Sequence, residues 1–356
     1  MGETRTGELP PTLADVARRA GVSRQTVSNA INNPSLLRAD TLARVQDAIE
    51  QLGYLPNRAA RNLRTGTTRL VGLRYTAAPE QSANTAMDRF VHALVAEARG
   101  SDHHVLLVAD APDEDGVPDP IKGYDDLLRS TAVDAFVVTE THLDRPQTAW
   151  LTERRALFVA FGRPWGEPDA RHSWVDVDGA AGVRAATEHL VQRGHRRIAW
   201  LGFGEDNRIS VDRRSGWEQA MAAADLDTAG LGNDCPDQLA DGIEAARALL
   251  PDAPDAPGAF DAPDAVVCAS DTLALAVLHV LAERGLRPGY DVSVVGFDDS
   301  TAAQVVPPGL TTVRAPLEEA AHEVVRALQR VLGPQPAEPT GVLLTPELIV
   351  RGSTVP

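Results

Sequence analysis

Residues 12–31 read TLADVARRAGVSRQTVSNAI, which is the pattern of two short helices joined through a glycine. Thr12 is a suitable N-cap for the first helix, and Asp15 follows three residues later as an acidic capping partner. Apolar residues then recur at helical spacing until Gly21, where a left-handed backbone costs little. Ser23 caps a second helix almost at once, so the stretch predicts a helix-turn-helix.

The second predicted helix has a polar face whose side chains could read DNA. Arg, Gln and Asn side chains each present paired hydrogen-bonding groups that suit base edges in the major groove. The predicted major-groove contacts are Ser23, Arg24, Gln25, Thr26, Ser28 and Asn29. A small helical hairpin with a merely solvated polar face is the alternative, because this pattern also occurs in proteins that do not bind DNA.

A third amphipathic helix follows the first two. Leu42, Val45, Ile49 and Leu52 have helical spacing, and Gly53 ends the helix. Three such helices can bury a shared core, so the pattern predicts a small helical domain.

A basic segment, YLPNRAARNLRTGTTR, occupies residues 54–69. Pro56 can begin a helix of about two turns over residues 57–63, and Leu63 would be exposed on it between arginines. Proteins that kink DNA insert such an apolar wedge between base steps in the minor groove. A plain basic linker is the alternative interpretation.

The charge of the chain is unevenly distributed. The net charge is −16, yet residues 1–66 contain nine arginines and six acidic residues, so this part is +3 and the remainder −19. Lys122 is the only lysine, so nearly all cationic contacts fall to arginine, which binds phosphate and guanine in a bidentate manner. A basic head on an acidic body places the polyanion-binding surface at the head.

The bulk properties exclude several classes of protein. A length of 356 residues favours a small domain plus a larger one. No apolar run approaches 18 residues and no secretion-signal pattern is present, so we expect a cytoplasmic protein without a membrane span. Cys235 and Cys268 lack metal-ligand spacing, so we expect no metal site.

Beyond residue 69 the pattern alternates between strands and helices. The predicted strands are Leu70–Tyr75, Val105–Ala109, Ala135–Thr139, Leu157–Phe161, Arg197–Gly202, Ala265–Ala269 and Val292–Phe297, with helices between them such as Thr85–Arg99, Ala180–Arg193 and Thr272–Arg284. This alternation indicates parallel sheets wrapped by helices, and the strands are too many for one sheet. We therefore predict two α/β lobes with a cleft at the carboxyl ends of the strands.

Motifs for catalysis are weak or missing. GFGEDN follows a predicted strand, but Asn207 stands where a dinucleotide fingerprint needs its third glycine. The sequence contains no P-loop, no nucleophile elbow and no H-E-x-x-H motif. We expect neither enzymatic activity nor a cofactor.

Taken in order, these segments resemble the LacI/GalR (lactose-repressor) family of bacterial transcription regulators. The matching stretches are TLADVARRAGVSRQTVSNAIN, AIEQLGYLPN and NRAARNLRTG at the front, and HLVQRGHRRIAWLG, DRRSGW, VVCASDTLALAVLHVLAERGLRPGYDVSVVGFDD and PGLTTVRAPLEEAA in the body. The resemblance implies an all-α helix-turn-helix domain followed by a two-lobed, type I periplasmic-binding-protein-like α/β domain with parallel sheets. The chain is expected to cross between the lobes three times.

The resemblance also implies where the domains divide. The expected divisions are a helix-turn-helix domain at 1–55, a hinge helix at 56–67 and an effector-binding and dimerisation domain at 68–356, with lobe 1 at about 68–172 and 301–332 and lobe 2 at about 173–300 and 333–356. In the family, paired hinge helices insert a leucine into the minor groove at the centre of a palindrome. The corresponding contacts here are Asn57, Arg58, Ala60, Arg61 and Leu63.

A small effector is expected between the lobes. Ser270 stands where many family members have Asn, and Arg163 could partly replace an Asp that many sugar-responsive members have at the position of Ala160. The residues that match effector positions or could form walls are Phe161, Arg163, Trp165, Arg213, Ser270, Asp298 and Leu317. Asp298 could instead cap a turn, and Arg213 could form a surface ion pair.

These observations predict a sequence-specific DNA-binding transcription regulator. We expect a homodimeric repressor that binds a palindromic operator in double-stranded DNA and responds to a small carbohydrate. A solute-binding or sugar-sensing protein without DNA function is one alternative, and a purine-type co-repressed regulator is another.

Overall fold

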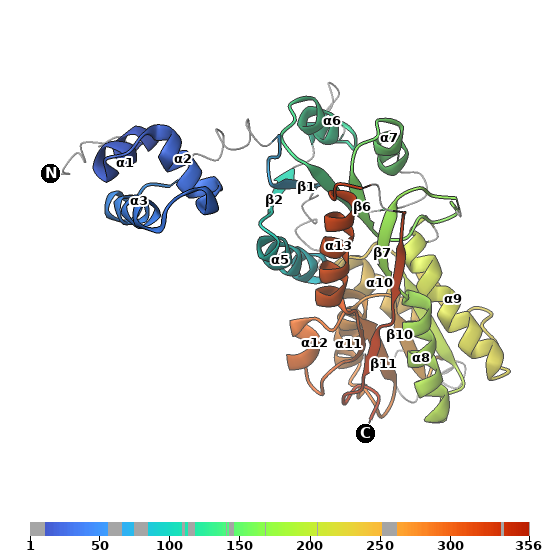
Figure 1. The fold of residues 1–356 in the computed structure, drawn as a ribbon. Coiled ribbons are helices and arrows are strands. Elements are labelled where there is room, and N and C mark those ends of the chain that lie inside the picture. Colours follow the sequence, from blue (N-terminus) through green and yellow to red (C-terminus); the bar gives the residue numbers. More distant parts are fainter. Residues whose placement is uncertain are drawn as a thin grey trace. The chain divides into compact units, whose positions relative to one another are not determined.

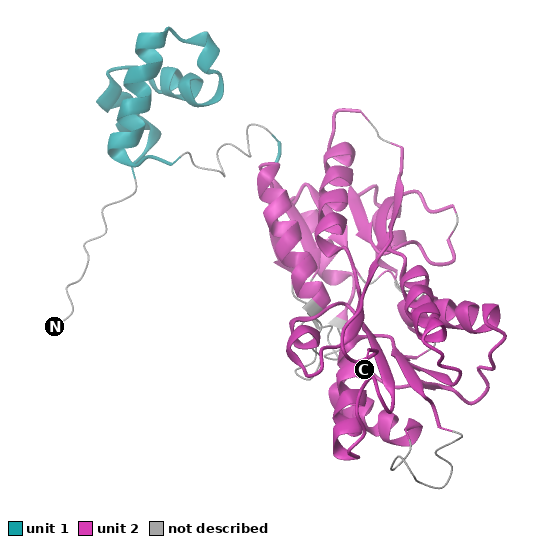
Figure 2. Cartoon of the chain, turned by 90° about the horizontal axis from the view of Figure 1, so that it is seen from below, with its two compact units in different colours: residues 1–68 teal, residues 69–356 magenta. Residues whose placement is uncertain are grey.

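The computed structural model describes residues 11–55, 66–74, 85–108, 111–112, 118–139, 141, 146–167, 169–204, 206–250, 262–335 and 338–355. The chain divides into two compact units, Met1–Thr68 and Arg69–Pro356 (Figure 2). The predicted hinge contacts, Asn57 to Leu63, lie outside the described residues.

The described part of the first unit, residues 11–55 and 66–68, contains a three-helix head. Its elements are α1 (Leu13–Ala20), α2 (Arg24–Asn32), the 3₁₀ turn η1 (Pro34–Leu36) and α3 (Ala39–Leu52). Each long helix contributes one fully buried valine to the core, namely Val16, Val27 and Val45. The predicted third helix therefore completes the core as expected.

Local capping explains where the first helix begins and ends. The Thr12 side chain accepts a hydrogen bond from the Asp15 amide, and the Asp15 carboxylate accepts one from the Thr12 amide at 2.9 Å. Gly21 ends the helix with φ +66°, a backbone conformation that suits glycine. The ends of α1, and so the turn that leads to α2, are therefore fixed by residues close together in the sequence.

The second unit has two lobes, each with a six-stranded sheet in its described part (Figure 1). The first sheet has the spatial order β13 (Gly341–Leu344), β7 (Ser173–Val177), β6 (Phe158–Phe161), β5 (Ala135–Val138), β1 (Leu70–Arg74) and β2 (His104–Val108). The second has the order β14 (Glu347–Ile349), β12 (Thr311–Arg314), β11 (Ser293–Phe297), β10 (Ala265–Cys268), β8 (Ile198–Gly202) and β9 (Gly232–Asp234). All of these pairings are parallel except β12 with β14. The predicted fold class is confirmed.

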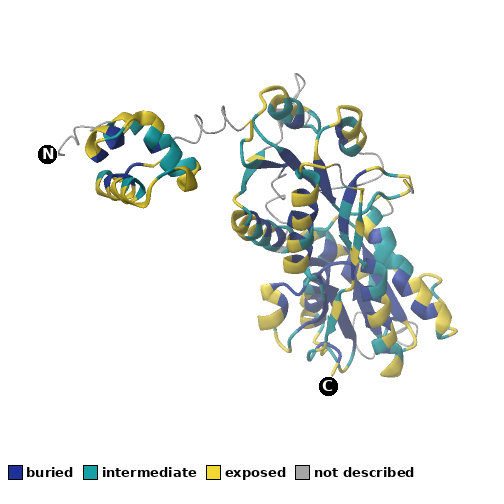
Figure 3. Ribbon diagram, in the orientation of Figure 1, coloured by how far each residue is buried: buried dark blue, intermediate teal, exposed yellow. Residues whose placement is uncertain are grey.

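Helices cover both faces of each sheet. In the first lobe α5 (Thr85–Gly100) packs with α13 (Leu317–Val331) on one face, while α6 (Lys122–Arg129) and α7 (Gln147–Glu153) share a separate apolar cluster with Phe136 and Phe158. The other elements among the described residues are α8 (Gly179–Gln192), α9 (Arg208–Ala223), α10 (Leu239–Leu249), α11 (Asp271–Glu283), α12 (Thr301–Val305) and a ribbon of β3 (Ala111–Pro112) with β4 (Pro118–Asp119). Buried residues concentrate in the strands and on the sheet-facing sides of the helices (Figure 3).

The chain crosses between the lobes three times, as the family resemblance implied, but the expected lobe boundaries were wrong. β7 pairs with β6 and so belongs to lobe 1, although the division placed everything from 173 in lobe 2. β12 pairs with β11 in lobe 2, and β13 pairs with β7 in lobe 1, each opposite to expectation. These three strands were not predicted, because polar residues break up β7 and β12 and the apolar part of β13 is only three residues long.

No helix in the described ranges is long and apolar enough to cross a bilayer.

Candidate functional site

The exposed side chains at the start of α2 form the candidate DNA-reading surface. Ser23 caps the helix by accepting a hydrogen bond from the Thr26 amide at 3.1 Å, and the two hydroxyls are 2.9 Å apart. Ser23, Arg24 and Gln25 are exposed, whereas Thr26, Ser28 and Asn29 are half-buried. The helix N-terminus and its exposed polar residues thus share one end of α2, a geometry that suits both phosphate and base contacts.

A side-chain hydrogen bond joins two of the residues that are predicted to contact bases. The Gln25 amide nitrogen donates to the Asn29 side-chain oxygen at 3.1 Å. This bond aligns two amide groups one helical turn apart, so less rotamer freedom is lost when they contact bases.

A cavity of about 300 Å³ lies between the two lobes of the second unit. It lies at the carboxyl ends of strands, where ligands bind in open parallel α/β sheets. Its described lining residues are Arg74, Ala86, Met87, Thr139, Thr141, Phe161, Gly162, Trp165, Asp176, Val177, Gly179, Phe203, Asn207, Ile209, Asp212, Arg213, Asp237, Ser270, Asp298, Ala315 and Leu317. Of the seven predicted effector residues, six line this cavity, and the seventh, Arg163, contacts two of its acidic side chains.

Arg213 on α9 is the central cation of the cavity. Its guanidinium lies 3.6 Å from the centre of the Phe297 ring, and its Nη1 donates to the Ala269 carbonyl at 2.5 Å. Its Nη2 is 3.9 Å from Asp298 Oδ1, and its buried Nε has no hydrogen-bond partner among the described residues. Burial lowers the Arg213 pKa, and the Asp298 carboxylate opposes that shift. The side chain is therefore held in place but not saturated with acceptors.

Asp298 follows β11 with φ +111°, an unusual conformation for a non-glycine residue. Burial raises the pKa of its carboxyl to about 7, although Arg213 favours the ionised form. The sequence alternative, in which Arg213 forms a surface ion pair, does not hold, because both side chains lie at the cavity and are mostly buried.

This raised pKa leads to a testable pH dependence. The folded protein holds a proton on Asp298 that the unfolded chain has already lost, so Asp298 lowers the free energy of unfolding as pH rises from about 4 to about 7. Asp298→Asn keeps a neutral side chain that tolerates positive φ. We expect the wild type to lose about 2 kcal/mol relative to this variant between pH 5 and pH 8.

Thermal unfolding of both proteins across that pH range measures the effect. Because all other titrating groups are shared, only the difference between the two melting temperatures matters. A difference that stays constant with pH would contradict a raised pKa at Asp298.

Ser270 lines the cavity and also caps a helix. Its hydroxyl donates to Asp237 Oδ1 at 2.5 Å and accepts from the Leu273 amide at 3.2 Å, so it caps α11. Asp237, which sequence reasoning missed, lines the cavity beside it, and burial raises its pKa while Ser270 and Arg213 oppose the shift. Ser270 therefore orients a cavity carboxyl in addition to lining the cavity itself.

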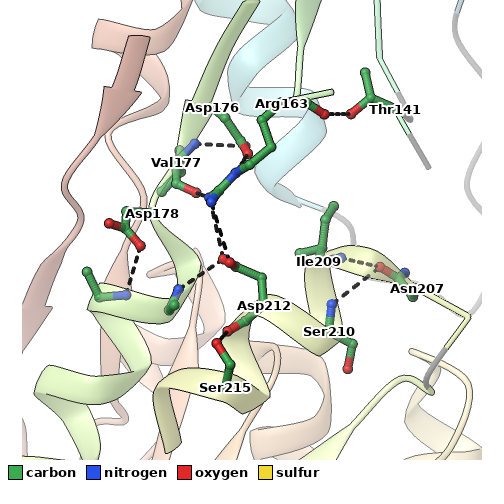
Figure 4. Close-up of polar contacts among 12 residues, drawn as sticks. Thr141, Arg163, Asp176, Val177, Asp178, Asn207, Ile209, Ser210, Asp212 and Ser215 are labelled. Atoms are coloured by element: carbon green, nitrogen blue, oxygen red, sulfur yellow. Dashed lines mark hydrogen bonds and ion pairs between the residues drawn. The ribbon is translucent and has the colours of Figure 1, made fainter. Parts of the chain in front are cut away.

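Acidic residues are the main group that sequence reasoning missed. Asp176, Asp212 and Asp237 all line the cavity, together with Asp298. Asp176 belongs to β7, which was not predicted. Asp212 immediately precedes Arg213, so its position in the sequence could have identified it as a cavity residue. Arg163 Nε donates to Asp176 Oδ2 at 2.5 Å, and its Nη2 is 3.4 Å from Asp212 Oδ2 (Figure 4).

Comparison with known proteins finds a family match in each of the two units. The family model for bacterial regulatory proteins of the lacI family matches residues 12–57, and that for a periplasmic binding protein-like domain matches residues 187–354. The HTH-type transcriptional regulator CelR of Thermobifida fusca is 36% identical over 352 residues, covering 96% of this chain and 98% of that protein. The regulator AglR of Rhizobium meliloti is 31% identical, covering 98% and 95%.

Solved structures give the same assignment. A CelR–cellobiose complex has a TM-score of 0.69 at 32% identity, covering 96% of this chain and 99% of that one. A lac repressor dimer bound to operator and the anti-inducer ONPF has a TM-score of 0.81 at 25% identity, covering 98% and 100%. The chain belongs to the LacI family of bacterial regulatory proteins.

Proposed function

We propose that this protein is a transcriptional repressor whose affinity for a palindromic operator is controlled by a small neutral carbohydrate bound between its lobes. A palindrome requires two reading heads, so the working form is a homodimer. Family membership supports the DNA-binding role, and the lac repressor structure that this chain resembles is a dimer on its operator.

The Arg213–Asp298 pair is the observation that carries the carbohydrate assignment. The two charged groups are 3.9 Å apart, too far for a good hydrogen bond between them, and both line the cavity. Neighbouring hydroxyls on a sugar ring can accept from the guanidinium and donate to the carboxylate at once. Phe161, Trp165 and Leu317 supply apolar walls for the ring faces.

The charge balance of the cavity favours a neutral ligand. Its described lining has four aspartates but two arginines, Arg74 and Arg213, and two of these aspartates share Arg163, so one negative charge is left over. A phosphorylated sugar would bring its anionic group close to these carboxylates, which like-charge repulsion disfavours. Cellobiose is the first sugar to test, because the similar CelR structure is a cellobiose complex. The volume of about 300 Å³ is at the lower end of the range for small-molecule sites.

The proposed switch is a shift between two arrangements of the lobes. The sugar must bind one arrangement better than the other, and a typical coupling of about 1–3 kcal/mol would change operator affinity by roughly 5- to 150-fold. The basic segment 54–69 connects the head to the body and transmits the change in this proposal.

The test begins with selection of bound duplexes from a random DNA pool at about 150 mM salt, where non-specific phosphate binding is weak. We expect a palindromic consensus from the full-length wild type, and a relaxed preference at one or two positions of each half-site from Gln25→Ala. The selected duplex, labelled with a fluorophore, is then titrated with protein in the presence of cellobiose, glucose 6-phosphate or hypoxanthine.

Release of the duplex by cellobiose alone supports the proposal. Tighter binding with hypoxanthine would instead support a purine-type co-repressed regulator. A pool without any enriched sequence, with or without these ligands, would contradict the DNA-reading role of α2.

A further inference from the structure

Arg163 connects the two lobes directly, because it lies between two carboxylates that come from different lobes (Figure 4). It follows β6 in the first lobe, where its Nε donates to Asp176 Oδ2 at 2.5 Å and its Nη2 donates to the Val177 carbonyl at 3.1 Å. The same Nη2 lies 3.4 Å from Oδ2 of Asp212, which belongs to α9 in the second lobe. One guanidinium thus binds a carboxylate from each lobe.

This cluster is largely shielded from water. The exposed fractions of the side chains are 20% for Arg163, 13% for Asp176 and 14% for Asp212. Burial raises the pKa of Asp212, and the charge of Arg163 opposes that shift. Removing the arginine would leave two carboxylates partly buried without their cation, which costs far more than breaking a surface ion pair.

The neighbouring backbone fixes Asp212 as well. Asp212 Oδ2 accepts a hydrogen bond from the Ala180 amide at 3.0 Å, near the point where the chain first enters the second lobe. At Gly179 a Cβ atom would lie 2.9 Å from Arg213 Cγ and 3.0 Å from Asp212 Oδ2. Asp212 and Arg213, which are adjacent on α9, therefore both pack closely against the backbone at Gly179.

The contacts of Arg163 are those expected of a residue that couples the two lobes. It is not among the described residues that line the cavity, whereas both of its carboxylate partners are. Trp165 does line the cavity, and the centre of its ring lies 4.4 Å from the guanidinium carbon of Arg163. Its position between the lobes, behind the ligand-facing groups, differs from that of a direct ligand contact.

We propose that Arg163 is a positioning residue that couples lobe closure to sugar binding, by holding Asp176 of one lobe and Asp212 of the other in the closed arrangement. This inference rests on the proposed carbohydrate function. A sugar that binds only the closed cavity has an apparent affinity proportional to the fraction of the protein that is closed. Loss of this link lowers that fraction, so it weakens binding without removing a direct contact.

The first experiment is a double-mutant cycle in the full chain, with Arg163→Gln, Asp212→Asn and the double variant titrated with cellobiose by calorimetry. We expect each single variant to bind cellobiose roughly 10-fold more weakly, and the double variant no more weakly than the worse single one. Arg163→Lys keeps the charge but not the fork that reaches both carboxylates, so it should restore only part of the affinity. Losses that multiply in the double variant would overturn the proposal, because independent contacts give that result.

A matched control separates this link from the loss of any arginine. Arg247 pairs with Glu283 on the surface at 2.9 Å, with exposed fractions of 53% and 40%. Arg247→Gln should leave cellobiose affinity unchanged, since exposed pairs contribute little. An equal loss in this control would also overturn the proposal.

The second experiment needs no sugar, and so distinguishes failure of the proposal from failure of the proposed function. The Ala180 amide donates to Asp212, whereas the adjacent Ala181 amide donates to Asp178 at 2.9 Å as part of the α8 cap. Residue-resolved hydrogen exchange should show Ala180 exchanging roughly fivefold faster in Arg163→Gln, with Ala181 unchanged. If wild type ignores cellobiose but Ala180 responds in this way, the sugar assignment fails and the link between the lobes remains. If Ala180 exchanges at the wild-type rate, Arg163 does not hold Asp212 and the proposal is wrong.

Discussion

Arg213→Ala is expected to abolish the response to sugar while the protein still binds its operator. The guanidinium is the cavity's central donor, and its removal also leaves the Asp298 carboxyl without its cation. Hydrogen bonds to a charged group contribute about 1.5–3 kcal/mol, so loss of those that the guanidinium donates to the sugar should lower cellobiose affinity roughly 100-fold. Operator affinity without sugar should change little, because the reading helix α2 belongs to a separate compact unit.

The neighbouring arginine provides the control for this prediction. Arg214 lies on the same helix but contacts Glu218 at 3.1 Å and Asp234 at 3.4 Å, and it is not among the described lining residues. Arg214→Ala should therefore retain both sugar affinity and release. Calorimetry with cellobiose and titration of labelled operator measure the two properties separately. If Arg213→Ala still releases operator at the wild-type sugar concentration, the effector does not bind in this cavity.

Gly216→Ala is expected to destabilise the body of the protein strongly. Gly216 lies on α9 where it crosses α8, and a Cβ atom there would be 2.1 Å from the Ala180 carbonyl oxygen. The obstacle is backbone in a helix, which cannot move aside as a flexible side chain can. We expect a loss of about 3 kcal/mol, near the upper end for overpacking, and a melting temperature lower by roughly 5–10 °C.

Gly100 supplies a matched glycine for comparison. It ends α5, and a Cβ atom there would meet nothing within 4 Å. Gly100→Ala should melt at or slightly above the wild-type temperature, since alanine restricts the unfolded chain. Melting curves followed by circular dichroism measure both changes. A Gly216→Ala protein that melts within about one degree of wild type would show that the two helices can separate at little cost.

Local signals account for the parts of the fold that could be predicted from sequence. The head follows from capping residues and apolar spacing, all of which act within about four residues along the chain. The strands β8, β10 and β11 are mostly apolar and are buried along their whole length in the second sheet, and each was predicted. Such buried parallel strands need no knowledge of their neighbours to be recognised.

The parts that were missed depend on contacts between distant segments. β7 and β13 pair with each other across more than 160 residues, and neither has a long apolar run. The aspartates of the cavity were missed for a related reason. Asp176 and Asp212 lie on different lobes, and Arg163 brings them together only after both lobes have formed. Arg213 and Asp298 could be predicted because they match motifs of the family.

The three crossings between the lobes have a consequence for synthesis of the chain. A nascent chain that has been made as far as Val331 contains β7 but not β13, its partner in the first sheet. Until residues 341–344 leave the ribosome, β7 presents an unpaired edge, and such edges invite pairing with other chains. The lobe that is begun first therefore cannot be completed until almost the whole chain has been made, and a ribosome stalled in this interval would hold an aggregation-prone intermediate.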